Sequence, residues 1–255
     1  MYTSSSSITA QNTLVKSFLG RTFSWMSAGL LLSAAVAFIT AHSPNLETAV
    51  AQGLWLLILL ELGAVLGLTL ALPRLSAATA GLLFIAYAAL NGLTLSGIFL
   101  AYSGSSIWGT FITTALMFGA MAVWGYTTRA DLTRFGSLLF MGLIGVILAL
   151  VVNLFLNNGA LGLVVNILGA LIFTGLTAWD VQKLKRMALF GMQGLAGNRG
   201  QGFGSGNSFS GSAWGGAVVQ SDVSEKMAIF GALMLYLDFI NLFLFLLRIF
   251  GGGRR

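Results

Sequence analysis

The sequence predicts an all-α, polytopic membrane protein with seven transmembrane helices, and three observations support this fold class. First, 57% of the 255 residues are hydrophobic and 8% are charged, whereas soluble domains carry about 25% charged residues. Second, thirty-three glycines and two prolines suit long helices that pack closely through small residues. Third, seven apolar runs reach the roughly 20 residues that cross a bilayer, at residues 22–41, 53–72, 77–102, 107–126, 137–156, 161–180 and 227–250.

The predicted membrane domain covers residues 22–250 and lies between two polar ends. Residues 1–21, which begin with a serine-rich stretch, are predicted to be a disordered cytoplasmic N-terminus, and residues 251–255 a short C-terminal tail. Ten glycines among the 27 residues of 191–217 predict a flexible cytoplasmic linker, because this composition buries too little apolar surface to fold. Asp222 followed by Glu225 has the spacing of a helix N-cap and predicts the start of the last helix.

The basic residues predict the orientation of the chain. Of the thirteen lysines and arginines, ten lie in the N-terminal segment or in connections on its side of the membrane. The other three are Arg248, Arg254 and Arg255, at or beyond the end of the last run. Because lysine and arginine are concentrated in cytoplasmic loops, we expect a cytoplasmic N-terminus and an external C-terminus.

Several function classes are excluded by composition. The chain has no cysteine and one histidine, His42, which falls in a predicted external loop. Thiol catalysis and metal centres built from cysteine or histidine clusters are therefore excluded, and the chain shows no motif of an intramembrane protease. We expect neither an enzyme activity nor a cofactor. The basic residues are not gathered on one amphipathic stretch, so we expect no nucleic-acid partner.

Three acidic residues, Glu61, Asp180 and Asp238, fall within or at the end of apolar runs. A carboxylate at the centre of a bilayer costs about 2.5–3.5 kcal/mol, so such residues usually face a partner or water. Asp180 can be explained by pairing with Lys183 on its own helix, and Glu61 by a structural hydrogen bond. Asp238 has no cation on its own helix nearer than Arg248, about 15 Å along, so we expect it to meet another helix or to line a cavity.

Arg74 is predicted at the cytoplasmic end of the second helix, level with Asp180. Two interpretations are open for this residue. It is either a topology anchor whose side chain extends to the membrane surface, or a partner for the Asp180 carboxylate.

Three passages of this chain resemble the Bax inhibitor family, also called the transmembrane BAX-inhibitor-motif proteins, in a bacterial version. They are YAALNGLTLS at 87–96, TGLTAWDVQK at 174–183 and LYLDFINLF at 235–243. The resemblance runs from the second helix to the C-terminus, although the glycine-rich linker is longer than is usual in the family. It implies a seven-helix bundle with the last helix at its centre, in a bacterial cell (inner) membrane.

The resemblance also implies a function for some of the acidic residues. Some members of the family are pH-dependent calcium leak channels, in which an aspartate on each of the last two helices acts as a pH sensor and ion-binding site, with an arginine as a latch. The motifs place these roles on Asp180 and Asp238, with Arg74 as the latch and Glu61 as a further acidic candidate. Calcium is then the ion that permeates or binds, tentatively at Asp180 and Asp238.

Elementary chemistry is consistent with this prediction. Calcium prefers six to eight oxygen ligands, which carboxylates, carbonyls and waters supply, and two carboxylates in one poorly hydrated site cannot both ionise freely. Two other function classes stay open. One is an interaction protein that regulates other membrane proteins, such as a quality-control protease, and the other is a proton-coupled transporter of small solutes.

Overall fold

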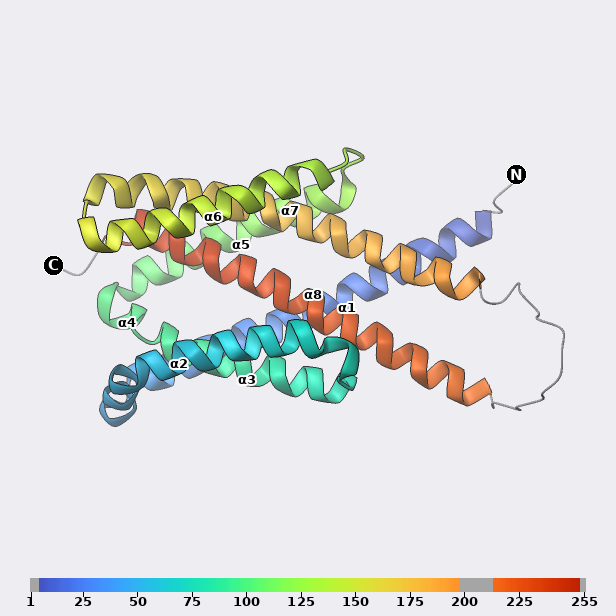
Figure 1. Cartoon of the computed structure of the whole chain (residues 1–255), viewed down its shortest axis with the longest axis horizontal. Coiled ribbons are helices and arrows are strands. Elements are labelled where there is room, and N and C mark those ends of the chain that lie inside the picture. Colours follow the sequence, from blue (N-terminus) through green and yellow to red (C-terminus); the bar gives the residue numbers. More distant parts are fainter. Residues whose placement is uncertain (1–4, 198–212, 253–255) are drawn as a thin grey trace.

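The computed structural model describes residues 5–197 and 213–252, and these fold into helices and short connections (Figure 1). Seven helices in this part of the chain are long and apolar enough to cross a membrane, which confirms the predicted fold class. The elements are α1 (Ser5–Ala41), α2 (Pro44–Ala71), the 3-10 helix η1 (Leu72–Arg74), α3 (Ala77–Leu95), α4 (Ile98–Ala101), α5 (Gly104–Thr127), α6 (Thr133–Leu156), α7 (Gly159–Gly197) and α8 (Ala213–Phe250).

Local sequence signals set several helix ends. Pro44 occupies the first turn of α2, where its missing N–H costs no hydrogen bond. The hydroxyl groups of Ser76 and Ser103 accept hydrogen bonds from backbone N–H groups in the first turns of α3 and α5, which satisfies donors that the helix leaves free. Asn157 ends α6 in a left-handed conformation, with φ at 47°.

The last helix lies at the centre of the bundle, as the resemblance implied. Figure 1 shows α8 running between the α2–α3 pair and the α6–α7 pair, with α1 crossing behind it. It packs against α1, α3, α5 and α7, and Leu235, Tyr236 and Leu242 are fully buried. In contrast, α2 and α6 carry outward-facing apolar side chains such as Trp55 and Phe155, which are 80% and 82% exposed. Such side chains suit contact with lipid.

Two helices extend beyond the predicted runs. The first begins at Ser5, whereas the sequence predicts disorder through residue 21. Within this extension Val15, Phe18 and Leu19 are buried against the bundle, which stabilises the helix there. The membrane-spanning part of α7 reaches Leu189, so Asp180 lies inside the span and not at its predicted end.

The third predicted run, residues 77–102, is two helices and not one. The break falls at Ser96 and Gly97, between α3 and α4. The Ser96 hydroxyl donates a hydrogen bond to the backbone oxygen of Leu93 at 2.6 Å. Serine side chains compete with the backbone in this way, and Gly97 adds little preference for a helix.

The helix-start signal at Asp222 was wrong, because α8 already begins at Ala213. The Asp222 carboxylate instead accepts a hydrogen bond from the backbone N–H of Ala77, at the start of α3. Nearby, Glu225 accepts a hydrogen bond from the indole of Trp25 at 2.7 Å. These acidic residues therefore tie α8 to α3 and α1. Most of the predicted linker at 191–217 lies outside the described residues.

Candidate functional site

Asp180 of α7 and Asp238 of α8 face each other in the core of the bundle. Their side chains lie within hydrogen-bonding reach, and the two residues are only 6% and 5% exposed. A hydrogen bond between two carboxyl groups needs a proton on one of them. Oδ1 of Asp180 and Oδ2 of Asp238 are buried and have no hydrogen-bond partner among the described residues. The carboxyl pair therefore has an unused oxygen on each side.

Close packing of α7 against α8 brings the two carboxyl groups together. On one side of the pair, a Cβ at Gly169 would lie 2.5 Å from the ring of Phe245, and on the other, a Cβ at Gly231 would lie 2.6 Å from Leu184. Both glycines allow a large side chain of the opposite helix to occupy the space of their missing Cβ. Small residues bring membrane helices together in this way, and here they hold the helices close on both sides of the pair.

Lys183 is the cation beside the carboxyl pair. It follows Asp180 by one turn of α7, is half-buried, and acts electrostatically on both Asp180 and Asp238. Its ammonium group lies 4.9 Å from the centre of the Trp179 ring, a cation–π distance. From the sequence, Lys183 was expected only to pair with Asp180 and was not a predicted site residue.

Arg74 does not contact the carboxyl pair in this structure. It ends η1 with an exposed side chain, and the ion pairs among the described residues involve Arg21, Arg186 and Lys226 instead. The role of Arg74 as a latch stays a prediction, and it requires movement of η1 or α2 toward Asp180.

Glu61 belongs to a separate polar network. Its carboxylate accepts hydrogen bonds from the Thr94 hydroxyl and the Asn91 side chain, both on α3. The side-chain amide oxygen of Asn91 accepts a hydrogen bond from the buried hydroxyl of Tyr236 on α8 at 3.0 Å. That hydroxyl is 2.6 Å from the hydroxyl of Ser33 on α1. The network links four helices, and it lies on the side of α8 that faces α3, away from α7.

The two carboxyl groups do not by themselves supply enough ligands for a metal ion. Within residues 5–197 and 213–252, no group of three or more histidine, cysteine, aspartate or glutamate side chains could hold a metal ion. Two carboxyl groups supply fewer oxygens than the six to eight that calcium prefers, so a bound calcium ion would keep several waters.

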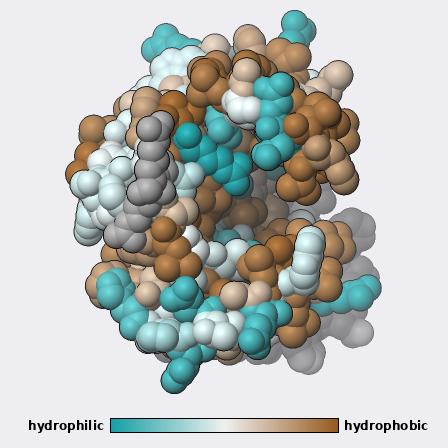
Figure 2. Space-filling view, turned by 90° about the vertical axis from the view of Figure 1, so that its left-hand side faces the viewer, coloured by the Kyte–Doolittle hydropathy of each residue, from teal (hydrophilic) through white to brown (hydrophobic). Residues whose placement is uncertain are grey.

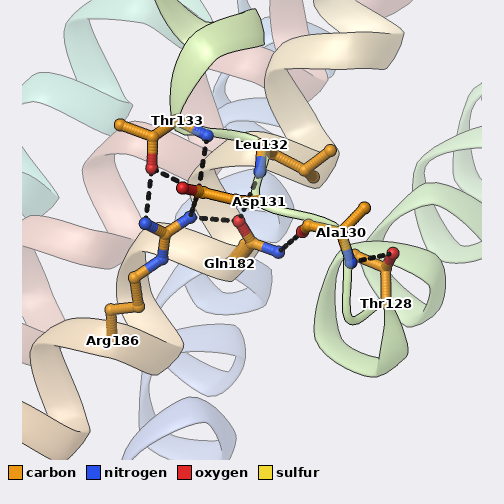
Figure 3. Close-up of polar contacts among 7 residues, drawn as sticks. All are labelled: Thr128, Ala130, Asp131, Leu132, Thr133, Gln182 and Arg186. Carbon is orange, nitrogen blue, oxygen red and sulfur yellow. Dashed lines mark hydrogen bonds and ion pairs between the residues drawn. The ribbon is translucent and has the colours of Figure 1, made fainter.

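A second polar cluster fixes the α5–α6 connection to the part of α7 that follows Asp180. Figure 3 shows the Arg186 guanidinium donating to Asp131, Thr133 and Gln182. The Gln182 amide donates to the backbone oxygen of Ala130 at 2.8 Å and accepts from the backbone N–H of Leu132 at 3.0 Å. The cluster therefore holds this connection through side chains of α7, close to the carboxyl pair.

Asp131 makes this cluster sensitive to strong acid. Hydrogen bonds from the hydroxyl and the backbone N–H of Thr133, together with Arg186, lower the pKa of Asp131 to about 2. Because the pKa is lower in the folded protein than the roughly 3.9 of a free aspartate, the stabilisation is complete above about pH 4. It is lost as the pH falls through about 2.

We expect a spin label at Arg129→Cys, in a chain without other cysteines, to be immobile from neutral pH down to about pH 4 and to become mobile toward pH 2. Asp131→Asn should leave the label mobile at every pH, because it removes the charge that Arg186 and Thr133 hold. Glu47→Gln, which changes an acidic residue in the first turn of α2, is the matched control. The same immobile label in Asp131→Asn and in the unsubstituted protein would show that Asp131 does not hold the connection.

Comparison with known proteins identifies the family. Residues 15–255 match the model of a family described as "Inhibitor of apoptosis-promoting Bax1". The chain belongs to the Bax inhibitor family. One relative is the "Inner membrane protein YbhL" of Escherichia coli (strain K12), which is 42% identical to this chain over 255 residues. The alignment covers 98% of this chain and 97% of the relative. A protein of Deinococcus radiodurans is 40% identical over 249 residues, covering 97% and 96%.

The family match covers all the residues named in the site, including the carboxyl pair. Sequence reasoning did not find Gln182 and Arg186, which act through the α5–α6 connection. The available signal was the run of polar residues after Asp180 within an otherwise apolar helix. Sequence reasoning also missed Tyr236, whose neighbour Asp238 drew attention first.

Proposed function

We propose that this Bax inhibitor family protein is a pH-sensitive calcium leak channel of the cell membrane. The observation that carries the proposal is the contact between Asp180 and Asp238 at the centre of the bundle, with one unpartnered oxygen on each carboxyl group. A hydrogen bond between two carboxyl groups requires a proton on one of them. A change of pH therefore changes the electrostatic interaction between the carboxyl groups of α7 and α8, from a hydrogen bond to a repulsion.

The proposed cycle has two states. In the proposed acid state the two carboxyl groups share a proton, and Arg74 is exposed and away from them, the position that it has in the structure. When the proton leaves, two negative charges in a poorly hydrated site repel each other and attract a cation. Arg74 then moves with η1 toward Asp180 and binds the carboxylate oxygens. Calcium competes with Arg74 for these oxygens, and the channel is closed while Arg74 occupies them. Lys183 is already close to both carboxyl groups. Its positive charge weakens the attraction of the deprotonated pair for a further cation.

Reconstitution tests this proposal. The full chain in liposomes that contain a calcium dye should pass calcium, with a flux that increases as the pH falls from about 8 to about 5. Liposomes without protein are the baseline. Absence of flux at every pH would refute the leak proposal and favour a protein that regulates other membrane proteins. A solute flux that needs a proton gradient would favour a transporter.

The latch role of Arg74 is tested in the same assay. We expect Arg74→Ala to raise the flux at neutral pH and to flatten its pH dependence, because no arginine then covers the deprotonated pair. Arg74→Lys should be intermediate, since lysine is a point charge without the two-pronged geometry of a guanidinium. Arg134→Ala, another exposed arginine, is the matched control. If Arg74→Ala keeps the pH profile of the unsubstituted protein, this residue is a topology anchor.

We further propose that the protein spans the bacterial inner membrane with its N-terminus in the cytoplasm and its C-terminus outside. The relative in Escherichia coli is named an inner membrane protein, and seven spans put the two termini on opposite sides. The distribution of lysine and arginine sets the direction. A reporter inserted within residues 198–212 should therefore be cytoplasmic, and a reporter after Arg255 external. The opposite pair of results would reverse the orientation.

A further inference from the structure

The central helix is not buried on all sides. Between Phe230 and Arg248, the side chains of α8 that keep some exposure recur at intervals of three and four residues, so they form one face of the helix. The rest of α8 in this region is buried against its neighbours. This face, called the α8 stripe below, consists of Phe230, Met234, Leu237, Asn241, Leu244 and Arg248.

The α8 stripe is the floor of an open groove. On one side of it Tyr236 packs edge-on against the rings of Phe84 and Tyr87 of α3, and on the other Asp238 meets Asp180 of α7. Figure 1 shows α8 lying between the α2–α3 pair and the α6–α7 pair, and the end view in Figure 2 shows a hollow in the surface of the molecule. The groove therefore opens sideways, toward the space that a bilayer occupies.

The chemistry of the groove differs along its length. Four of the six side chains of the stripe are apolar, and the amide of Asn241 donates to the backbone oxygen of Leu237. At the C-terminal end of α8, the exposed guanidinium of Arg248 lies 6.0 Å from the ring centre of Phe245. Among the described residues, Arg248 forms no ion pair with an acidic side chain. The groove thus combines an apolar floor with one unpaired cation at its end.

We propose that the groove binds a phospholipid, with its phosphate on Arg248 and one acyl chain along the α8 stripe. A guanidinium recognises phosphate through two parallel hydrogen bonds, and an apolar floor inside the bilayer suits a hydrocarbon chain. The twelve residues from Leu237 to Arg248 span about 16 Å of helix, which is about half of a hydrocarbon core of roughly 30 Å. One acyl chain of one leaflet therefore fills this length, and its end lies beside Asp238. This binding site does not depend on the proposed calcium leak.

Cross-linking tests the proposal with the full chain in nanodiscs. The probe is a phosphatidylglycerol that carries a photoreactive diazirine at the end of one acyl chain. We expect cross-links to concentrate at Met234 and Leu237, and to exceed those at Leu154 and Phe155 of α6, which also face outward. A diacylglycerol with the same chain and no phosphate should cross-link weakly. Even cross-linking over all outward-facing residues, or equal yields from the two probes, would overturn the proposal.

Two substitutions separate the ends of the site. Arg248→Gln should lower the cross-linking yield at Leu237 about tenfold, the effect of one lost charge-assisted hydrogen bond, while the matched control Arg134→Gln leaves it unchanged. Leu244→Trp should lower the yield by filling the groove while Arg248 is intact.

Elution as a single species and unchanged helical circular dichroism show that each variant is folded. An unchanged yield in Arg248→Gln refutes the phosphate contact. Disulfide-linked dimers of Leu244→Cys in the bilayer would instead assign the groove to a second copy of the chain.

Discussion

Replacing either Asp180 or Asp238 by asparagine is expected to make calcium flux independent of pH. Asparagine keeps the shape of the side chain and its ability to form hydrogen bonds, but it has no charge, so it resembles the protonated acid. With either residue changed, loss of a proton no longer creates two charges that repel, and Arg74 loses part of its target. Flux should therefore stay, at every pH, near the level that the unsubstituted protein reaches in acid.

The double substitution should resemble each single one, because two groups that share a proton act as one unit, whereas independent sites add. The measurement is calcium flux into liposomes from about pH 5 to about pH 8 for the four proteins. Glu47→Gln is the matched control, since it changes an acidic residue in the first turn of α2, outside the buried core. If both single variants keep the pH midpoint of the unsubstituted protein, the sensor is elsewhere, and Glu61 is the next candidate.

Gly125→Val is expected to be the most destabilising of the single substitutions considered. A Cβ at Gly125 of α5 would lie 2.3 Å from the backbone oxygen of Ala178 on α7, and 2.8 Å from its Cα. These are backbone atoms, so the clash can be relieved only by moving one helix from the other. Overpacking of this kind costs about 1–3 kcal/mol or more. Because Ala178 precedes Asp180 by two residues, we also expect Asp180 to shift away from Asp238.

The matched control is Gly119→Ala, on the same helix, where a Cβ meets nothing within 4 Å. Because alanine favours a helix more than glycine by about 1 kcal/mol, this control should be neutral or slightly stabilising. Thermal unfolding in detergent, followed by the loss of the monodisperse elution peak, measures both variants. A Gly125→Val protein as stable as the Gly119→Ala protein would show that α5 and α7 are not in close contact there.

The part of the candidate site that could be predicted is the part that violates the hydropathy pattern. Asp238 stood out because it lies in the middle of an apolar run without a cation on its own helix, and the structure places it against another helix. Asp180 was found with it through the family motif, and the match over residues 15–255 confirms that family. The cation beside the pair could not be ranked in the same way. Arg74 and Lys183 were both at the expected level, and only the path of α7 puts Lys183 next to the carboxyl groups.

The glycines also show a difference between what the sequence suggests and what the structure decides. The segment GAVLG at residues 63–67 of α2 has two glycines at the spacing of a helix-packing motif. However, a Cβ at Gly63 or Gly67 would meet nothing within 4 Å. At Gly125 and Gly136, which belong to no such motif, a Cβ would lie 2.3 Å from the opposite helix. Spacing describes one helix surface alone, whereas close contact depends on which surface the partner helix meets.

The sequence by itself determined the class of the protein, its seven spans and the three acidic side chains within them. These follow from the transfer free energies of individual residues, which need no knowledge of their neighbours. Only the tertiary structure decided that Asp180 meets Asp238, that Glu61 joins a separate network, and that one face of α8 stays open. These features depend on the crossing angles and relative heights of helices far apart in the chain. Packing between helix surfaces sets both, and no single segment contains that information.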